Sequence, residues 1–443
     1  MYDKIEKIDR GQLEKLQLER LQNVVAHVYK NCKPYAEKMD KAGIKPGDIK
    51  SLNDLRKLPF TTKEDLRKNY PFGMFSAPMS DIVRLHASSG TTGKLTVAGY
   101  SRPDLDMWTD VMARSLAQVG VGKDSIVNVA YGYGLFTGGL GAHYGSEKLG
   151  AVTIPASSGN TKRQLQLLKD FGVTTLCCTP SYALYLADEM EKEGYALTDF
   201  KLQQGIFGAE QWTEEMRTQI EKRLGLKAYD IYGISEITGP GVSMECEYQA
   251  GAHIWEDHFL PEIVCPETFE PLKPGEKGEL VFTTITKTGM PLIRYRTRDI
   301  TSLSYDKCKC GRTHARMARL VGRNDDMLII RGVNVFPSQI ESALLSCNGC
   351  VEPHYQIIID RAKNLDTLEV QVELDDKWLN NETESQKLKI SMQNEISSAI
   401  SVGCKITFVK RGELERSQGK AVRVKDSRNN IKAVVCPDRK GAG

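Results

Sequence analysis

The sequence lacks an excess of either charge. Among its 443 residues, 60 lysines and arginines stand against 57 aspartates and glutamates, which leaves a net charge of +3. A chain so close to neutral has no general attraction for nucleic acid or for an anionic membrane surface. A site for a polyanion must therefore be local, and we expect neither nucleic acid nor a membrane among the partners.

Long apolar runs are absent as well. The longest uncharged stretch, residues 125–146, is interrupted by glycines and by Asn128 and His143, so it would make a poor lipid-facing helix. The first residues have no apolar core of the kind that a secretory signal needs. We therefore expect a cytoplasmic protein whose 11 cysteines are thiols or metal ligands rather than a disulfide framework.

Hydrophobic patterning separates helical from mixed segments. Residues 1–80 predict helices, because apolar side chains recur every three or four residues over 13–28. Residues 81–324 alternate apolar runs with amphipathic segments at 103–119 and 162–170, which predicts a mainly parallel sheet covered on both faces. The apolar runs of this region are 82–85, 125–130, 151–155 and 174–178.

The pattern changes again toward the C-terminus. From about residue 262 the sequence predicts a smaller strand-rich region. Residues 325–430 predict a separate α+β domain with a helix at 387–400, followed by a loose tail at 431–443. The predicted strands of that domain are 327–330, 355–360, 368–374 and 405–409.

A loop of small polar residues follows the apolar run at 82–85. It combines four hydroxyls, two glycines and a lysine: Ser88, Ser89, Gly90, Thr91, Thr92, Gly93 and Lys94. Glycine lets the backbone approach a phosphate closely, hydroxyls and amides donate hydrogen bonds, and the lysine adds charge. The glycine spacing differs from that of a Walker A loop. The composition indicates a phosphate-binding loop, with an ordinary surface turn as the alternative.

Two carboxylates follow predicted strands at 229–236 and 295–299. In the first segment Tyr232 is suited to lie against a purine. Glu236 is suited to hold Mg²⁺ on phosphates, because hard cations prefer oxygen ligands. In the second segment Asp299 is placed to accept hydrogen bonds from two ribose hydroxyls. An ordinary strand end is the alternative for each.

Two polar segments near the C-terminus complete the set. The stretch 321–326 lies at the predicted domain boundary and is flanked by glycine, which is typical of a hinge. The stretch 415–420 places Lys420 after a small flexible loop. A surface hairpin and a solvated tail are the respective alternatives.

The order and spacing of these segments are more specific than any one of them. Together they resemble the adenylate-forming superfamily of acyl-CoA synthetases, luciferases and peptide-synthetase adenylation domains, and within it the phenylacetate–CoA ligase family. The resemblance spans about residues 13–426. It rests on segments 88–100, 131–139, 208–210, 234–236 and 415–420. The absence of a proline before Lys94 and of proline and threonine within 415–420 departs from the superfamily pattern but fits the phenylacetate–CoA ligase variant.

The resemblance implies a fold and several roles. The fold is α/β: a large domain of helix-flanked β-sheets with a strand-rich subdomain, followed by a small mobile α+β lid domain. The loop at 88–94 would hold the β- and γ-phosphates of ATP, and Glu236 would bind Mg²⁺. Asp299 and Arg323 would bind ribose. Residues that would frame adenine or complete the nucleotide site are Gly208, Ala209, Glu210, Asp230, Ile231, Tyr232, Gly233 and Ser235.

The implied reaction has two steps. A carboxylate attacks the α-phosphate of ATP to give an acyl-adenylate and pyrophosphate, and the thiol of coenzyme A then displaces AMP. Lys420 would contact the carboxylate and the α-phosphate in the first step. In this superfamily the small domain turns between the steps, so Asp325 would be the hinge and Gly332 would approach the CoA thiol. The family also implies a homodimer.

An aryl acid needs a flat apolar pocket. Aromatic and glycine residues suit that task because a flat ring packs well on aromatic faces. The candidates are Tyr131, Tyr133, Phe136, Phe207 and Gly208. Core packing is the alternative for Tyr133 and Phe136.

Cysteine and histidine residues predict a metal site. Cys308 and Cys310 form a tight pair, and Cys246 with His253 completes a Cys₃His set suited to tetrahedral zinc. Four protein ligands leave no open position, so this zinc would be structural. His314 is an alternative to His253, and four unrelated side chains are the alternative to a site. We interpret Cys347 and Cys350 as free thiols.

Three functions remain open at this stage. The leading one is an AMP-forming arylacetate–CoA ligase that uses ATP, Mg²⁺ and coenzyme A, with structural Zn²⁺. The second is an adenylating relative with another acid, such as indoleacetate or benzoate, or another acceptor, such as a carrier-protein thiol. The third is a non-enzymatic nucleotide-binding zinc module, against which Lys420 and Glu236 argue.

Overall fold

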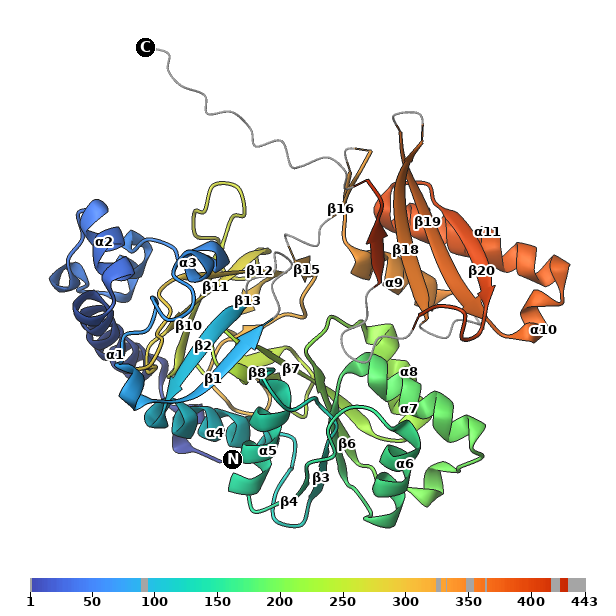
Figure 1. Cartoon of the computed structure of the whole chain (residues 1–443), viewed down its shortest axis with the longest axis horizontal. Helices are drawn as coiled ribbons and strands as arrows, with labels where there is room; N and C mark the ends of the chain where they lie inside the picture. Colours follow the sequence, from blue (N-terminus) through green and yellow to red (C-terminus); the bar gives the residue numbers. More distant parts are fainter. Residues whose placement is uncertain are drawn as a thin grey trace. The chain divides into compact units, whose positions relative to one another are not determined.

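A computed structural model describes residues 2–88, 95–323, 328–331, 333–347, 354–362, 365–415 and 423–428 (Figure 1). The described chain forms two compact units. The first contains the residues up to 323 apart from 213–216, and the second contains 213–216 with the residues from 328 onward. The predicted fold class, a large α/β domain with a small α+β domain, is confirmed.

Short helices form the N-terminal part of the first unit. They are η1 (Lys4–Lys7), α1 (Arg10–Asn31), α2 (Lys33–Lys41), η2 (Pro46–Asp48), η3 (Leu52–Lys57), α3 (Lys63–Lys68) and η4 (Met79–Asp81). In α1 the apolar side chains predicted over 13–28 are buried except Leu16, which is partly exposed, and Gln17 is buried with them. Helix α3 begins where Thr62 and Asp65 form a reciprocal capping box.

A nine-stranded sheet forms the centre of the first unit, in the order β13-β14-β9-β8-β7-β6-β5-β3-β4. Strands β4, β3, β5, β6 and β7 pair in parallel, and the remaining pairs are antiparallel. The bounds are β3 (Ile126–Val129), β4 (Val152–Ile154), β5 (Thr175–Cys178), β6 (Gln204–Gly208), β7 (Lys227–Ile234), β8 (Gly239–Glu245), β9 (Ala252–Ile254), β13 (Leu303–Ser304) and β14 (Arg316–Met317). The predicted parallel sheet is therefore present in this region, with an antiparallel extension beyond β7.

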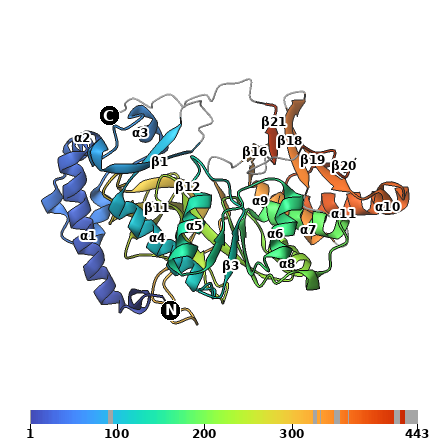
Figure 2. The same ribbon diagram turned by 60° about the horizontal axis from the view of Figure 1, so that its bottom comes forward.

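Helices cover both faces of the parallel strands. Figures 1 and 2 show α4 and α5 on one side of β3 and β6, and α6, α7 and α8 on the other. Their bounds, with those of one short helix, are α4 (Arg102–Ala117), α5 (Gly138–Lys148), α6 (Thr161–Asp170), α7 (Pro180–Lys192), η5 (Leu197–Asp199) and α8 (Glu214–Leu224). This is the arrangement that alternating strands and helices predict.

The apolar run at 82–85 differs from the prediction. It begins β1 (Ile82–Ser88), which pairs antiparallel with β2 (Thr96–Ser101) in a two-stranded sheet of its own. Only seven residues join these strands, and a parallel connection needs a crossover of a dozen or more. The short loop therefore dictates the antiparallel pairing.

A four-stranded antiparallel sheet, in the order β10-β11-β12-β15, completes the first unit. Its strands are β10 (Phe259–Val264), β11 (Gly278–Thr284), β12 (Tyr295–Thr301) and β15 (Gly322–Arg323). It corresponds to the strand-rich region expected from about residue 262. One continuous apolar cluster links this sheet, the nine-stranded sheet and the N-terminal helices.

The second unit has its own core. A sheet in the order β20-β19-β18-β21 packs with helices, and a small β16–β17 pair adjoins it. The bounds are β16 (Leu328–Ile330), β17 (Val333–Val335), α9 (Pro337–Ser346), β18 (Tyr355–Ala362), β19 (Leu365–Leu374), α10 (Asp376–Leu379), α11 (Glu382–Ile400), β20 (Lys405–Lys410) and β21 (Val424–Asp426). Within the described residues of both units, no helix combines the length and the apolar character that a bilayer crossing requires.

Candidate active site

The turn between β7 and β8 carries Glu236, which is buried. Its carboxylate Oε1 accepts a hydrogen bond from Ser88 Oγ at 3.1 Å and lies 3.6 Å from Lys63 Nζ. The turn is tight because Gly233 meets Gly239 directly: a Cβ added at Gly233 would lie 1.7 Å from the Gly239 carbonyl oxygen. The structure thus brings the first residue of the predicted phosphate loop beside the predicted Mg²⁺ ligand.

The same turn is supported from its backbone side. The Tyr100 hydroxyl lies 3.0 Å from the carbonyl oxygens of both Ser235 and Thr238, and Ser235 Oγ lies 3.2 Å from Thr137 Oγ1. Lys287 Nζ lies 3.5 Å from the carbonyl oxygen of Glu236. Burial lowers the pKa of Lys287 to about 8. Buried polar side chains therefore hold the backbone of this turn.

Tyr232 and Asp299 meet although they are far apart in sequence. The Tyr232 hydroxyl donates a hydrogen bond of 2.6 Å to Asp299 Oδ2. The Tyr232 ring stacks on Phe282, with 6.3 Å between centroids and 29° between planes. Asp299 on β12 pairs in register with Arg323 on β15. The residue predicted to face the purine and the two predicted to bind ribose are therefore neighbours.

The ends of β6 and β7 bring the predicted adenine frame together. Gly208 pairs with Ile231 so closely that an added Cβ would lie 2.1 Å from the Ile231 carbonyl oxygen. Ala209 follows in the left-handed region with φ 71°, and Glu210 Oε1 accepts the Ser181 amide at 2.7 Å. These residues turn the chain sharply at the carboxyl end of the parallel sheet, where ligands of such sheets bind.

Asp230 lies in this frame but is directed into the protein. Its carboxylate accepts a hydrogen bond of 2.9 Å from Trp212 Nε1, and its amide donates to Glu245 Oε2 at 2.8 Å. Burial, reinforced by the charge of Glu245, raises the pKa of Asp230 to about 6, although Arg319, Trp212 and Arg217 oppose the shift. Asp230 is therefore built into the wall of the frame.

The aromatic residues predicted for the acyl pocket differ in how deeply they are buried. Phe207 is fully buried and packs edge-on against Trp212, with 5.9 Å between centroids. Tyr131 is buried and donates to the Ile206 carbonyl oxygen at 3.2 Å. Tyr133 is half-buried with its hydroxyl 3.3 Å from His143 Nδ1, whereas Phe136 is 37% exposed. Tyr131 and Phe207 thus contribute to packing, and Tyr133 and Phe136 stay nearer the surface.

The predicted metal ligands form one cluster. One ligand atom each from Cys246, His253, Cys308 and Cys310 lies within 4.8 Å of all the others. Cys246 Sγ is 3.8 Å from Cys308 Sγ, and Cys310 Sγ is 3.4 Å from His253 Nε2. With Zn–S bonds of about 2.3 Å, a tetrahedral zinc separates two sulfurs by roughly 3.8 Å. The spacing therefore fits zinc.

The electrostatics of the cluster favour a thiolate. Burial opposes ionisation of Cys310, but hydrogen bonds from His253 and Arg312 outweigh it and lower the pKa of Cys310 to about 5. Burial raises the pKa of Cys246 to about 12. His253 Nδ1 lies 3.4 Å from the His314 carbonyl oxygen, which is the usual partner of a metal-binding histidine.

The alternative ligand, His314, is engaged elsewhere. Its Nδ1 accepts the Glu256 amide and its Nε2 lies 3.0 Å from the Ile5 carbonyl oxygen. Cys347 is buried, with its Sγ 3.4 Å from the Ala343 carbonyl oxygen. The structure therefore brings His253, and not His314, to the three cysteines.

Several predicted residues lie outside the part of the chain that the structure describes. They are Ser89, Gly90, Thr91, Thr92, Gly93, Lys94, Asp325, Gly332, Cys350 and Lys420, together with the tail after residue 430 and the side chain of Arg323. Their roles stay predictions.

Sequence reasoning missed two side chains of this region. Lys63 follows the Thr62 cap of α3, and its ammonium reaches Glu236. Trp212 has no motif of its own, yet it contacts both Phe207 and Asp230. A lysine at the first position of a helix, where anions rather than cations are favoured, was the available signal for Lys63.

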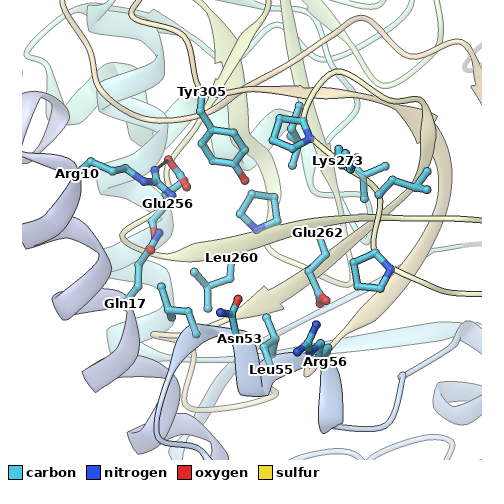
Figure 3. Close-up of a pocket in the computed structure, with 17 residues that line it drawn as sticks. Arg10, Gln17, Asn53, Leu55, Arg56, Glu256, Leu260, Glu262, Lys273 and Tyr305 are labelled. Carbon is cyan, nitrogen blue, oxygen red and sulfur yellow. Dashed lines mark hydrogen bonds and ion pairs between the residues drawn. The ribbon is translucent and has the colours of Figure 1, made fainter.

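A cavity of about 300 Å³ opens at a different place in the first unit (Figure 3). Arg10 and Glu256 form an ion pair of 2.6 Å in its wall, and the Arg10 guanidinium lies 4.9 Å from the centre of the Tyr305 ring. None of the residues that line it was predicted for the nucleotide, acyl or metal sites. This cavity is therefore separate from the candidate active site.

Comparison with protein families gives two matches. The family described as AMP-binding enzyme matches residues 29–286, and the AMP-binding enzyme C-terminal domain matches residues 332–428. Among curated proteins, the phenylacetate-coenzyme A ligase of Escherichia coli (strain K12) is 50% identical over 435 residues, covering 97% of this chain and 98% of that protein. The phenylacetate-coenzyme A ligase of Thermus thermophilus is 48% identical, covering 95% and 97%.

Solved structures give a further comparison. A 2-hydroxyisobutyryl-CoA ligase in the postadenylation state, in complex with R3-HIB-AMP, superposes with a TM-score of 0.90 at 28% identity, covering 95% of this chain and 91% of that one. The same ligase with 2-HIB-AMP and CoA in the thioesterification state gives a TM-score of 0.71 at 29% identity, covering 96% and 91%.

Proposed function

This chain belongs to the AMP-binding enzyme family, and within it to the phenylacetate-coenzyme A ligases, and from that premise we propose the reaction that it carries out. An aryl carboxylate attacks the α-phosphate of ATP and releases pyrophosphate, and the CoA thiol then attacks the acyl-adenylate and releases AMP. The observation that carries this conclusion is near-half sequence identity to phenylacetate-coenzyme A ligases along nearly the whole length of both chains.

Direct attack of the CoA thiol on the free acid is difficult because a carboxylate is a weak electrophile and hydroxide is a poor leaving group. Adenylation solves both problems, but charge accumulates at phosphorus in the transition state, and fixed positive charge stabilises it. Mg²⁺, when bound, would neutralise phosphate charge. Glu236 is our candidate for its protein ligand, and Ser88 beside it would donate to a phosphate oxygen. The loop from Ser89 to Lys94 would hold the β- and γ-phosphates.

Lys63 joins this set on geometry. Its ammonium is 3.6 Å from Glu236 Oε1 and is 31% exposed, so the pair is loose enough to admit a ligand. A phosphate oxygen that enters between them would gain the ammonium as a partner. We therefore assign Lys63 to the phosphate end of the site.

The nucleoside would occupy the carboxyl ends of β6 and β7. Residues 208–210 and 230–233, with Ser235, would frame adenine. Asp299 and Arg323 would bind the ribose, and the Tyr232 hydroxyl that donates to Asp299 Oδ2 would orient that carboxylate. Support comes from the contacts between Tyr232 and Asp299 and between Gly208 and Ile231.

Lys420, Asp325 and Gly332 would serve the two steps in turn. Lys420 would stabilise the attack on the α-phosphate, and rotation about Asp325 would replace it by Gly332 for thioester formation. The 2-hydroxyisobutyryl-CoA ligase has been solved in both a postadenylation and a thioesterification state. That relative supports a two-state cycle in this chain.

The acid is phenylacetate or a related aryl acid. Its ring would be received by Tyr131, Tyr133, Phe136, Phe207 and Gly208. We also propose that the enzyme is a homodimer that works in the reducing cytoplasm, in keeping with the unpaired thiols of the described cysteines. No nucleic acid or membrane partner is needed for this reaction.

A structural zinc is part of the proposal. The Cys₃His donor set has the composition and the sulfur spacing of a closed tetrahedral site, and its ligand atoms are mostly buried. Such a zinc would tie the segment at 308–310 to β9 and to the end of β8. It would stabilise the fold and take no part in the chemistry.

Carboxylate-dependent exchange of pyrophosphate into ATP tests the function. The panel contains phenylacetate, indoleacetate, benzoate and their hydroxylated forms, each run with and without CoA. Exchange that needs an aryl acid, together with AMP release that needs CoA, is the expected result. AMP release that is indifferent to CoA would assign the acyl group to another acceptor.

A further inference from the structure

Lys287 is buried behind the turn that carries Glu236, with 2% of its surface exposed. Its Nζ lies 3.5 Å from the Glu236 carbonyl oxygen and 4.7 Å from the centre of the Tyr100 ring. The charges of Asp104 and Glu236 act on this ammonium, but among the described residues it forms no ion pair at contact distance. Burying an ammonium without a paired carboxylate is costly, so packing alone does not explain a lysine here.

The contacts of Lys287 and Tyr100 converge on one turn. The Tyr100 hydroxyl is shared between the carbonyl oxygens of Ser235 and Thr238, each at 3.0 Å. Together with the carbonyl of Glu236, three of the four carbonyl groups in this turn face the pair. The pair therefore fixes the orientation of the peptide groups on both sides of Glu236.

Lys287 is itself held in place by its neighbours. The amides of Thr288 and Gly289 donate to the two carboxylate oxygens of Asp104, at 2.7 and 2.9 Å. Ser76 Oγ donates to the Thr288 carbonyl oxygen at 2.9 Å. A lysine stem that starts from so constrained a backbone loses little further freedom when its ammonium is positioned.

Different atoms of Glu236 make its contacts with Lys287 and with the phosphate end of the site. Its carboxylate faces Ser88 Oγ and Lys63 Nζ, whereas its carbonyl oxygen faces Lys287 Nζ. We propose that Lys287 is a positioning residue for adenylation, which acts through the backbone of Glu236 to present the Glu236 carboxylate to the metal–nucleotide complex. This inference rests on the role proposed above for Glu236.

Direct binding of Mn²⁺–ATP, measured by electron paramagnetic resonance without an acid present, tests the inference. Lys287→Met keeps the length of the side chain and removes its charge and hydrogen bonds. Partners that orient a metal ligand are worth about 10–100-fold in metal affinity, so the dissociation constant of Mn²⁺–ATP should rise by about tenfold or more. The matched control is Lys277→Met, which alters an exposed lysine just before β11 and should bind like the parent.

Two half-reactions add a second readout. Pyrophosphate exchange by Lys287→Met should fall by about 10–100-fold and recover in part at high Mg²⁺. Thioester formation from supplied acyl-adenylate and CoA should stay within about threefold of the parent, because it does not use the phosphate end of the site. A purely structural defect would lower both half-reactions together and would not respond to Mg²⁺.

The outcomes are distinct. Mn²⁺–ATP affinity and exchange within twofold of the parent would overturn the inference. If Lys287→Met does not fold, Tyr100→Phe removes the other contact to the same turn, and unchanged Mn²⁺–ATP affinity in that variant would overturn it too. If Glu236→Gln still binds Mn²⁺–ATP tightly, Glu236 is not the metal ligand, and the inference that Lys287 acts through it is wrong. A parent that binds Mn²⁺–ATP but activates no acid would refute the proposed function alone.

Discussion

The Glu236 site and the Cys₃His cluster are both assembled from distant parts of the chain, but they differ in how completely they are paired. In the cluster, each ligand atom lies within 4.8 Å of the other three. At the Glu236 site, the carboxylate's contacts with the described residues are a hydrogen bond from Ser88 and a loose ion pair of 3.6 Å with Lys63. One group is closed on itself, and the other retains partners that a ligand can take over.

This difference in pairing corresponds to the two proposed roles, a structural role for the cluster and a chemical role for the Glu236 site. Four protein ligands satisfy a zinc ion and leave no position for a substrate. A carboxylate and an ammonium that do not fully engage each other can both turn to an incoming metal–phosphate complex. The proposed stabilising group is therefore the closed one, and the proposed reactive group is the one whose described partners can exchange for a ligand.

The largest effect should come from Lys420, which tests whether the Glu236 site is completed by the C-terminal segment. Lys420→Ala should lower the formation of phenylacetyl-adenylate on the order of 10²–10³-fold, because a donor that stabilises transition-state charge is lost. The same variant should still convert supplied phenylacetyl-adenylate and CoA to the thioester. Single-turnover kinetics of the two half-reactions measures both rates.

Gly332→Leu is the matched counterpart of Lys420→Ala. A bulky side chain near the CoA thiol should impair thioester formation and spare adenylation. Equal loss of both half-reactions in Lys420→Ala would mean that the lysine serves one fixed site and that the two-state cycle is wrong for this chain.

Glu236→Gln tests the open side of the comparison directly. The amide keeps the hydrogen-bonding shape but loses the charge that a hard cation prefers. We expect the Mg²⁺ concentration for half-maximal exchange to rise by about tenfold or more, with thermal stability close to that of the parent. Superimposable Mg²⁺ titrations of the two proteins would show that Glu236 is not a ligand.

Local patterns predicted most of the secondary structure. The three- and four-residue spacing of apolar side chains indicates α1, and the capping box at Thr62 marks the start of α3. The runs at 125–130, 151–155 and 174–178 became the parallel strands β3, β4 and β5. The pairing partner of β1 was harder to predict from the sequence, because whether an apolar run joins a larger sheet depends on the loop that follows it.

The site shows the same division. Motif order brought Ser88, Tyr232, Glu236 and Asp299 into one prediction, and the structure places them in two touching pairs. Sequence could not choose between His253 and His314, because both lie near the cysteines and only the backbone contacts of His314 exclude it. Lys63 and Lys287 were missed, since nothing in their local sequence shows which distant turn they contact.

Removal of the proposed zinc tests the structural role of the Cys₃His cluster. Protein purified without added metal should contain about one zinc per chain, and Cys308→Ser should lose it. If the site contributes about 3 kcal/mol, the melting temperature should fall by roughly 3 °C. Adenylation measured well below that temperature should be nearly unchanged. Cys404→Ser, at a half-buried cysteine in the second unit, is the control. Metal-free parent protein of equal stability would refute the zinc site.

The smallest effect concerns Asp230, a partly buried carboxylate of the predicted nucleotide frame. Burial raises its pKa to about 6 in the folded protein, above the value of about 3.9 in an unfolded chain. Between these values the folded state binds more protons, so the free energy of unfolding should decrease as pH rises from 4 to 6.

Asp230→Asn keeps an acceptor for Trp212 Nε1 but cannot ionise. The variant should therefore lose that part of the pH dependence, at most about 3 kcal/mol, and gain stability relative to the parent at pH 7.5. Urea unfolding at pH 4.5 and 7.5 measures the difference, with Asp106→Asn at an exposed position of α4 as the control. Parallel pH dependence of the free energy of unfolding in the parent and in Asp230→Asn would contradict this prediction. It would show that the surroundings of the Asp230 carboxylate do not destabilise its charged form, and that in this respect Asp230 resembles Glu236 more than the cysteine cluster.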